Sequence, residues 1–132
     1  MHKLYNSHKA LLVDRLGKVL LLRSSNPNEY GEDWDLPGGM MESGEEPLDC
    51  LVREVLEETG IHIDKRDAKM FYQKMAKGFG DMASEDVLKT FYTVSIEDHE
   101  LALSWEHKDF RWIDPRNNLD DDIDGYVVDV IE

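Results

Sequence analysis

Residues 39–61 constrain this chain more than any other part of its sequence. Residues 46–59 have the pattern of one amphipathic helix, with Pro47 suited to its first turn and Gly60 to the position after its last. At about 100° per residue, one side of the helix is apolar and is expected to face the core. That side consists of Leu48, Leu51, Val52, Val55 and Thr59.

An acidic sector lies beside this apolar side. Glu54, Glu57 and Glu58 stand at i, i+3 and i+4, so they are surface neighbours on the helix and repel one another by roughly a few tenths of a kcal/mol per pair. A divalent metal and a phosphate-bearing ligand would account for this arrangement, and oxygen ligands select hard cations such as Mg²⁺ or Mn²⁺. The alternative is a solvated acidic helix face. Zn²⁺ is not expected, because no histidines pair at i+4 among His2, His8, His62, His99 and His107.

Arg53 and two glycines are expected to support this sector. Arg53 can bridge Glu45 or Asp49 and so hold the preceding loop against the helix. Gly38 and Gly39 allow the backbone to approach a metal or phosphate closely, and can free a carbonyl oxygen for ligation.

The rest of the chain predicts a β-sheet with a further helix. Residues 9–13 and 18–23 flank a Gly-containing turn, which favours a β-hairpin, and their unbroken apolar runs favour strands covered on both faces. Residues 34–37 are expected to be extended, because the residue before a proline disfavours helix. The remaining elements expected are strands at 69–75, 87–96 and 110–113, loops at 24–33, 76–86 and 97–108, and a C-terminal helix at 120–131. This order predicts a single α/β domain over residues 1–132, with a mixed sheet between helices.

Charge and composition limit the partners of the chain. Its 132 residues carry a formal net charge of −14, which argues against unaided binding to duplex nucleic acid or an anionic membrane. The apolar runs are too short to span a bilayer, and residues 1–13 lack the apolar core of a signal peptide. The single cysteine, Cys50, allows no intramolecular disulfide and is expected to be a small buried thiol. We therefore expect a cytoplasmic protein, and a homodimer remains open.

Residues 39–61 resemble the Nudix box of the Nudix hydrolase family. Five residues separate Gly39 from Glu45, and seven separate Glu45 from Arg53. The positions that follow also match the box: Glu54, apolar Val55, Leu56, Glu57, Glu58, Thr59, Gly60 and apolar Ile61. The lead-in at residues 36–39, Leu-Pro-Gly-Gly, is similar to that of the family as well. The resemblance implies the Nudix α/β/α sandwich.

The resemblance also implies an activity, the hydrolysis of a nucleoside diphosphate linked to another group, X, with Mg²⁺ or Mn²⁺ as cofactor. By position, Glu54, Glu57 and Glu58 would be metal ligands, and the Gly39 carbonyl would be an additional ligand. Glu45 and Arg53 would be the supporting pair. A carboxylate would take the proton of the attacking water.

Glu57 is the first candidate for this base, and Glu106, in the loop before residues 110–113, is the second. For Glu106 an ordinary surface glutamate is an equal alternative. Arg23 ends a strand and could reach a substrate phosphate, but a surface arginine is the simpler interpretation. Three aromatic residues are candidates for stacking on a base, with core or rim packing preferred for each: Trp34, Tyr72 and Phe79.

The expected partner is a small nucleotide whose identity stays open. The family resemblance and the small single domain favour a nucleoside triphosphate, cut to the monophosphate and pyrophosphate. Alternatives within the class are ADP-ribose, a nucleotide sugar and a dinucleoside polyphosphate. An alternative of another class is a non-catalytic nucleotide-sensing domain. The three mutually repelling glutamates argue against that alternative, because a domain that only binds has no need of them.

Overall fold

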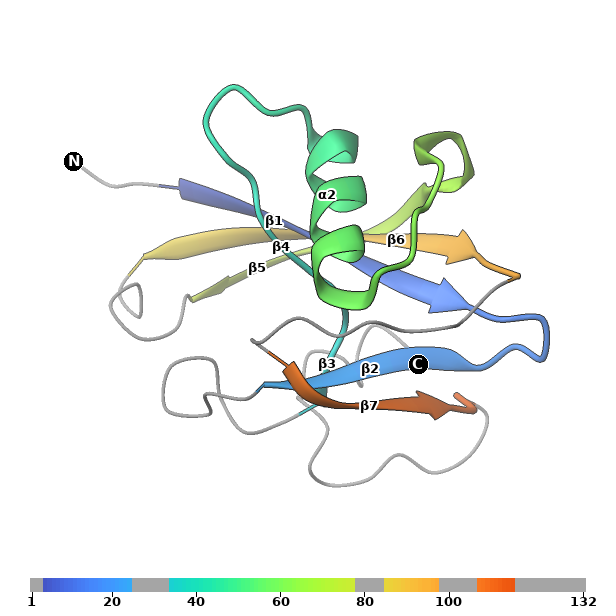
Figure 1. Cartoon of the computed structure of the whole chain (residues 1–132). Helices are drawn as coiled ribbons and strands as arrows, with labels where there is room; N and C mark the ends of the chain where they lie inside the picture. The colour runs from blue at the N-terminus through green and yellow to red at the C-terminus, as the bar shows by residue number, and fades with distance from the viewer. Residues whose placement is uncertain (1–3, 25–33, 78–84, 98–106, 116–132) are drawn as a thin grey trace.

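The computed structural model describes residues 4–24, 34–77, 85–97 and 107–115 (Figure 1). They form one seven-stranded mixed sheet in the order β3-β2-β1-β6-β5, with β4 paired to β1 and β7 paired to β2. The strands are β1 (Leu4–Val13), β2 (Val19–Ser24), β3 (Trp34–Asp35), β4 (Gly38–Met40), β5 (Lys69–Lys77), β6 (Asp86–Ser95) and β7 (His107–Ile113).

The predicted helix is confirmed as α2 (Pro47–Thr59). Pro47 occupies its first turn, and Gly60 ends it in the left-handed conformation, φ 78°, with its N–H bonded to the carbonyl oxygen of Leu56. A glycine adopts this conformation without the steric penalty of a Cβ. Leu51, Val55 and Thr59 are fully buried, as the apolar periodicity predicts. A single 3₁₀ turn, η1 (Lys65–Asp67), follows the helix.

Two cores lie on opposite faces of the sheet, as the unbroken apolar runs predict. On β2, Leu20 and Leu22 pack in the core beneath α2, whereas Val19 and Leu21 pack in the second core. Side chains alternate along a strand, so a strand buried on both faces needs an unbroken apolar run. The second core also contains Trp34, Leu36 and Phe91.

The hairpin expected from residues 9–23 exists only at its turn. Asp14 accepts hydrogen bonds from the backbone N–H groups of Leu16 and Lys18, and Val13 pairs with Val19. Beyond that pair the strands part, because the edge of β1 that faces β2 pairs with β4 at residues 7–9, while its other edge pairs in parallel with β6 over residues 4–13 and 86–95. The hairpin prediction is therefore wrong beyond the turn. Sequence neighbours could not reveal a partner strand about 80 residues away.

The strands also extend beyond their expected bounds. β1 begins at Leu4 rather than at residue 9, since its polar N-terminal half pairs with β4 and β6. β5 reaches Lys77, β6 begins at Asp86, and β7 begins at His107. The expected C-terminal helix at 120–131, the second helical layer of an α/β/α sandwich, lies outside the described residues. No helix within the described ranges is long and apolar enough to cross a membrane.

Because β1 and β2 diverge after Val13 and Val19, the sheet has one part built on β1 and another built on β2. Residues 34–40 connect these two parts. Their first half pairs with β2 as β3, and their second half pairs with β1 as β4 (Figure 1). The helix α2 packs against β1 and β4. This crossing segment places Gly38 and Gly39 beside the acidic side of α2.

Candidate active site

Arg53, in the middle of α2, is the centre of a polar cluster that joins the helix to the preceding loop. Its Nε and Nη2 donate to Glu45 at 2.7 and 3.1 Å, and Nη2 also donates to the carbonyl oxygen of Met40 at 3.2 Å. Its Nη1 donates to Glu54 at 2.9 Å and to Glu57 at 3.3 Å. This hydrogen bonding lowers the pKa of Glu45 to about 2. The predicted Glu45–Arg53 pair is present, and it fixes the loop against the helix.

Asp49, the other partner expected for Arg53, instead forms an ion pair with Lys65 at 3.3 Å. Both side chains are more than half exposed, so this pair contributes little to stability.

Glu58 is buried rather than on the surface, which corrects the expectation of three surface neighbours. It is 6% exposed, and its Oε1 accepts a hydrogen bond of 2.7 Å from the backbone N–H of Gly38. Burial raises the pKa of Glu58 to about 8, although Lys9 and the Gly38 N–H both lower it. A carboxylate that is held in place by a hydrogen bond and is shielded from water is suited to bind a cation.

Glu54 lies directly against Gly39. A Cβ built on Gly39 would stand 2.7 Å from both Cδ and Oε2 of Glu54, so the absent side chain provides the space for this carboxylate. The Glu54 side chain is 18% exposed, and burial raises its pKa while Arg53 lowers it. Glu57 is the most open of the three, with 57% of its side chain exposed.

The donor set fits a hard divalent cation. Glu54, Glu58 and the Gly39 backbone come together beside the crossing segment, and all offer oxygen. Within the described ranges no three His, Cys, Asp or Glu side chains converge closely enough to enclose a metal ion. The hydrogen bonds explain this, because Arg53 holds Glu54 and Glu57 while the Gly38 N–H holds Glu58.

The pKa of Glu58 gives a testable pH dependence of stability. Its pKa of about 8 in the folded protein lies above the ordinary value of 4.5, so the native state binds the proton more tightly than the unfolded state does. The stabilisation is complete below about pH 4.5 and is lost as the pH rises through about 8. Glu58→Gln keeps an oxygen for the Gly38 N–H but cannot ionise.

In EDTA, we therefore expect the Tm of the wild type to fall relative to that of Glu58→Gln between pH 5 and pH 9. Thermal unfolding by circular dichroism measures this difference. Mg²⁺ should flatten the dependence, because a bound cation favours the ionised carboxylate. A difference in Tm that stays constant with pH in EDTA would contradict the assignment.

Cys50, His8 and Tyr92 form a buried polar group next to the loop. Cys50 is fully buried, as predicted, and burial raises the pKa of its thiol to about 12. Its Sγ donates to the carbonyl oxygen of Gly39 at 3.6 Å. His8 Nδ1 lies 2.9 Å from the Tyr92 hydroxyl, and burial lowers the pKa of this histidine. An uncharged His8 and an un-ionised Cys50 serve packing rather than acid–base chemistry.

Arg23 lies against the ring of Trp34. Its guanidinium lies 5.7 Å from the ring centroid of Trp34, and Arg111 lies over the same ring at 4.5 Å. Trp34 is 3% exposed, which confirms core packing, while Tyr72 is 38% exposed and contacts Phe91. The geometry favours cation–π packing for Arg23 over the phosphate contact. Glu106 and Phe79 lie outside the described residues.

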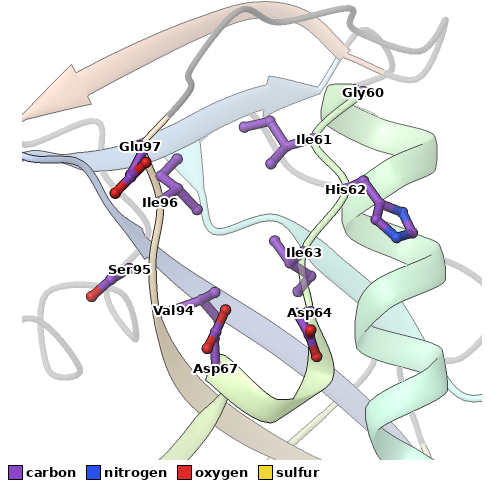
Figure 2. Close-up of a pocket in the computed structure, with 10 residues that line it drawn as sticks. All are labelled: Gly60, Ile61, His62, Ile63, Asp64, Asp67, Val94, Ser95, Ile96 and Glu97. Carbon is purple, nitrogen blue, oxygen red and sulfur yellow. The ribbon is translucent and has the colours of Figure 1, made fainter.

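A cavity of about 500 Å³ lies just beyond the C-terminal end of α2 (Figure 2). Its apolar side chains come from Ile61, Ile63, Val94 and Ile96, and the carboxylates of Asp64, Asp67 and Glu97 stand beside them. None of the glutamates around Arg53 lines it. The cavity is therefore separate from the acidic cluster.

Comparison with known families gives the same assignment over almost the whole chain. The profile of the NUDIX domain matches residues 7–128. This chain belongs to the Nudix family. Nudix hydrolases act on phosphoric anhydride bonds.

Individual relatives agree with this membership. The chain is 36% identical over 97 residues to the uncharacterized Nudix hydrolase YvcI of Bacillus subtilis, covering 74% of this chain and 58% of YvcI. It is 29% identical over 96 residues to the rat asymmetrical bis(5'-nucleosyl)-tetraphosphatase, covering 73% of this chain and 63% of that protein. The Nudix chain thus spans less than two thirds of the length of these relatives.

Solved structures confirm the Nudix fold. The MutT protein of Methanosarcina mazei matches with a TM-score of 0.83 and 25% identity, over 98% of this chain and 91% of that one. The MutT Nudix hydrolase of Burkholderia pseudomallei matches with a TM-score of 0.81 and 20% identity, over 98% and 97%. The mixed sheet with α2 on one face is therefore the MutT-like arrangement.

One residue of this site was not anticipated from the sequence. Lys9 is largely buried on β1, and its Nζ donates to Asp35 at 3.2 Å and to the carbonyl oxygen of Leu36 at 3.3 Å. A lysine at the start of an apolar run has the pattern of a strand flank. Only the pairing of β4 with β1 brings it to the glutamates.

Proposed function

We propose that this chain hydrolyses the pyrophosphate linkage of a nucleoside diphosphate linked to X, with Mg²⁺ or Mn²⁺ as cofactor. The observation that carries the proposal is the assembled box, in which Arg53 joins Glu45, Glu54 and Glu57 while Gly38 orients the buried Glu58. The preferred substrate is a nucleoside triphosphate, which is cut to the monophosphate and pyrophosphate.

Each residue has a separate part in this proposal. Glu54, Glu57 and Glu58, with the Gly39 carbonyl, would hold the cation, which when bound neutralises phosphate charge and lowers the pKa of water. The ion pair between Arg53 and Glu45 holds the loop before α2 against the helix. The absent side chains of Gly38 and Gly39 leave room for the β1 backbone and for the Glu54 carboxylate, and a contact of these glycines with substrate phosphates stays a prediction.

The proton acceptor is proposed to be Glu57. Its side chain is 57% exposed, so a carboxylate oxygen can reach a water beside the substrate after leaving the 3.3 Å contact with Arg53. Glu106 is the second candidate for this role. A base within hydrogen-bond reach of the proton contributes about 10²–10⁴ in rate.

The choice of substrate rests on the resemblance to MutT structures and to a MutT-like protein of Streptomyces ambofaciens. The similarity to the rat bis(5'-nucleosyl)-tetraphosphatase favours a dinucleoside polyphosphate as the second candidate. ADP-ribose and nucleotide sugars are further candidates within the class. A nucleotide-sensing domain without catalysis is the alternative outside it. The cytoplasmic location and the homodimer remain predictions.

A substrate panel tests this choice. The protein is incubated with Mg²⁺ and a nucleoside triphosphate, a deoxynucleoside triphosphate, oxidised dGTP, a dinucleoside tetraphosphate, ADP-ribose or a nucleotide sugar. We expect the highest kcat/KM for a triphosphate, by at least about tenfold, which corresponds to about 1.4 kcal/mol of transition-state binding. Chromatographic quantification of products gives the rates. Tight binding of one nucleotide without turnover of any would instead support the sensor.

A further inference from the structure

Lys9 is joined to the crossing segment by both its backbone and its side chain. Its Cα pairs with that of Gly38 across β1 and β4. Its ammonium donates to Asp35 Oδ2 at 3.2 Å and to the Leu36 carbonyl oxygen at 3.3 Å. A Cβ on Gly38 would stand 2.7 Å from the Lys9 Cα, so the two strands are in close contact. Lys9 therefore controls where residues 35–38 lie.

The same segment provides the backbone groups of the site. The Gly38 N–H holds Glu58 at 2.7 Å, and the face of Gly39 accommodates the Glu54 carboxylate. A displacement of residues 35–38 would change the positions of both carboxylates. A shift of about 1 Å at a reacting centre can reduce the rate by about 10².

The charge of Lys9 also acts on these carboxylates. Burial alone would lower the pKa of Lys9, but the charges of Asp35, Glu58 and Glu54 outweigh burial and raise it. The ammonium therefore stays protonated at neutral pH. Its positive charge acts on Asp35 and, through space, on Glu58 and Glu54.

Packing does not explain why a lysine stands at this position. Leu11 and Val13, the next residues on the same side of β1, are apolar and pack against the second core. The Lys9 side chain is 12% exposed, and an apolar side chain there would avoid the desolvation of a charge. Buried ion pairs often give no more stability than apolar residues of similar volume. We therefore interpret the lysine at position 9 as serving the candidate active site rather than core packing.

We propose that Lys9 is a positioning residue for the hydrolytic reaction. Its ammonium fixes residues 35–38, which place the Gly38 N–H that holds Glu58 and lead into Gly39 against Glu54, so both carboxylates are in place before the cation binds. The proposal rests on the proposed function, since it assigns Lys9 to the same cation site.

The test replaces the ion pair by a neutral pair of similar shape, Lys9→Met with Asp35→Asn. We expect a Tm within about 5 °C of the wild type, since both charges of the Lys9–Asp35 pair are removed together. The affinity of the substrate-free protein for Mn²⁺, measured from the EPR signal of free Mn²⁺ at pH 7.5, is expected to fall at least about tenfold. The kcat should fall similarly, while the KM for the nucleotide changes less than about threefold.

Two single variants serve as comparisons. Lys9→Arg keeps the charge and should stay within about threefold of the wild type in Mn²⁺ affinity. Lys77→Met removes a β5 lysine that pairs with Asp86 at 2.6 Å away from the site, and it should leave Mn²⁺ affinity and kcat unchanged. If the double variant does not fold, Lys9→Gln is titrated in its place, with the same expected loss.

Wild-type Mn²⁺ affinity and kcat in the charge-free variant would overturn the role of Lys9 and leave it a structural ion pair. The Mn²⁺ titration needs no substrate, so it still decides on Lys9 if the wild type turns over no nucleotide. Absence of nucleotide turnover by the wild type would count against the proposed function and not against the role of Lys9.

Discussion

Glu57→Gln is expected to lower kcat by about three orders of magnitude while leaving the fold intact. The amide cannot accept the proton of the attacking water, and such a base contributes about 10²–10⁴ in rate. Loss of a carboxylate also weakens the cation site. The Glu57 side chain is 57% exposed and makes one described ion pair, with Arg53, so the Tm should change by no more than about 2 °C. Steady-state kinetics with saturating Mg²⁺ measure the loss.

Asp49→Asn is the matched control, because Asp49 is an exposed acid of the same helix that pairs with Lys65 away from the cluster. It should retain wild-type kcat. Glu106→Gln, measured beside it, separates the two candidate bases. A near-normal kcat in Glu57→Gln with a loss of about 10³ in Glu106→Gln would transfer the role of base to Glu106.

Gly38→Ala should mainly lower stability, whereas Gly39→Ala should mainly lower kcat. Gly38 has φ 135°, and a Cβ there would collide with the carbonyl oxygen of His8, a backbone atom that cannot move aside. We expect Gly38→Ala to lose roughly 3 kcal/mol or more of unfolding free energy, or about 10 °C in Tm. At Gly39 the φ is not positive, and the Cβ would instead displace the Glu54 carboxylate.

Gly39→Ala should therefore keep a near-wild-type Tm and lose about 10² or more in kcat. Gly44→Ala is the control for backbone conformation alone. Its φ is 80° and nothing lies within 4 Å of its Cβ, so only about 1–2 kcal/mol of stability should be lost, with kcat unchanged. Thermal unfolding and kinetics on all three variants give both readouts. Equal losses of stability at Gly39 and Gly38 would show that Gly39 serves the backbone and not the carboxylate.

The sequence predicted those parts of the site that are local. The bounds of α2 follow from Pro47, Gly60 and the apolar periodicity. Spacing left Glu45 and Asp49 as possible partners of Arg53, and the family resemblance implied Glu45, which is the partner that the structure shows. These features depend on residues close together in the chain. They were accordingly the parts that could be predicted most closely.

Long-range pairing could not be predicted in the same way. The turn at Asp14 suggested that β1 and β2 remain paired, but β1 forms a parallel ladder with β6 and accepts β4 on its other edge. That exchange opens the sheet and lets residues 34–40 cross it. The burial of Glu58 and the contact of Lys9 with Asp35 both result from this crossing, so neither was visible in helix or strand periodicity.

The central claim is that this Nudix chain hydrolyses a nucleotide pyrophosphate linkage by means of a cation held at Glu54, Glu57 and Glu58. The most direct measurement is ³¹P NMR of a nucleoside triphosphate incubated with the protein, first in EDTA and then with excess Mg²⁺. The account predicts no change in EDTA and the appearance of nucleoside monophosphate and pyrophosphate after Mg²⁺ is added. Nucleoside diphosphate and inorganic phosphate as the products, or equal rates with and without Mg²⁺, would contradict it.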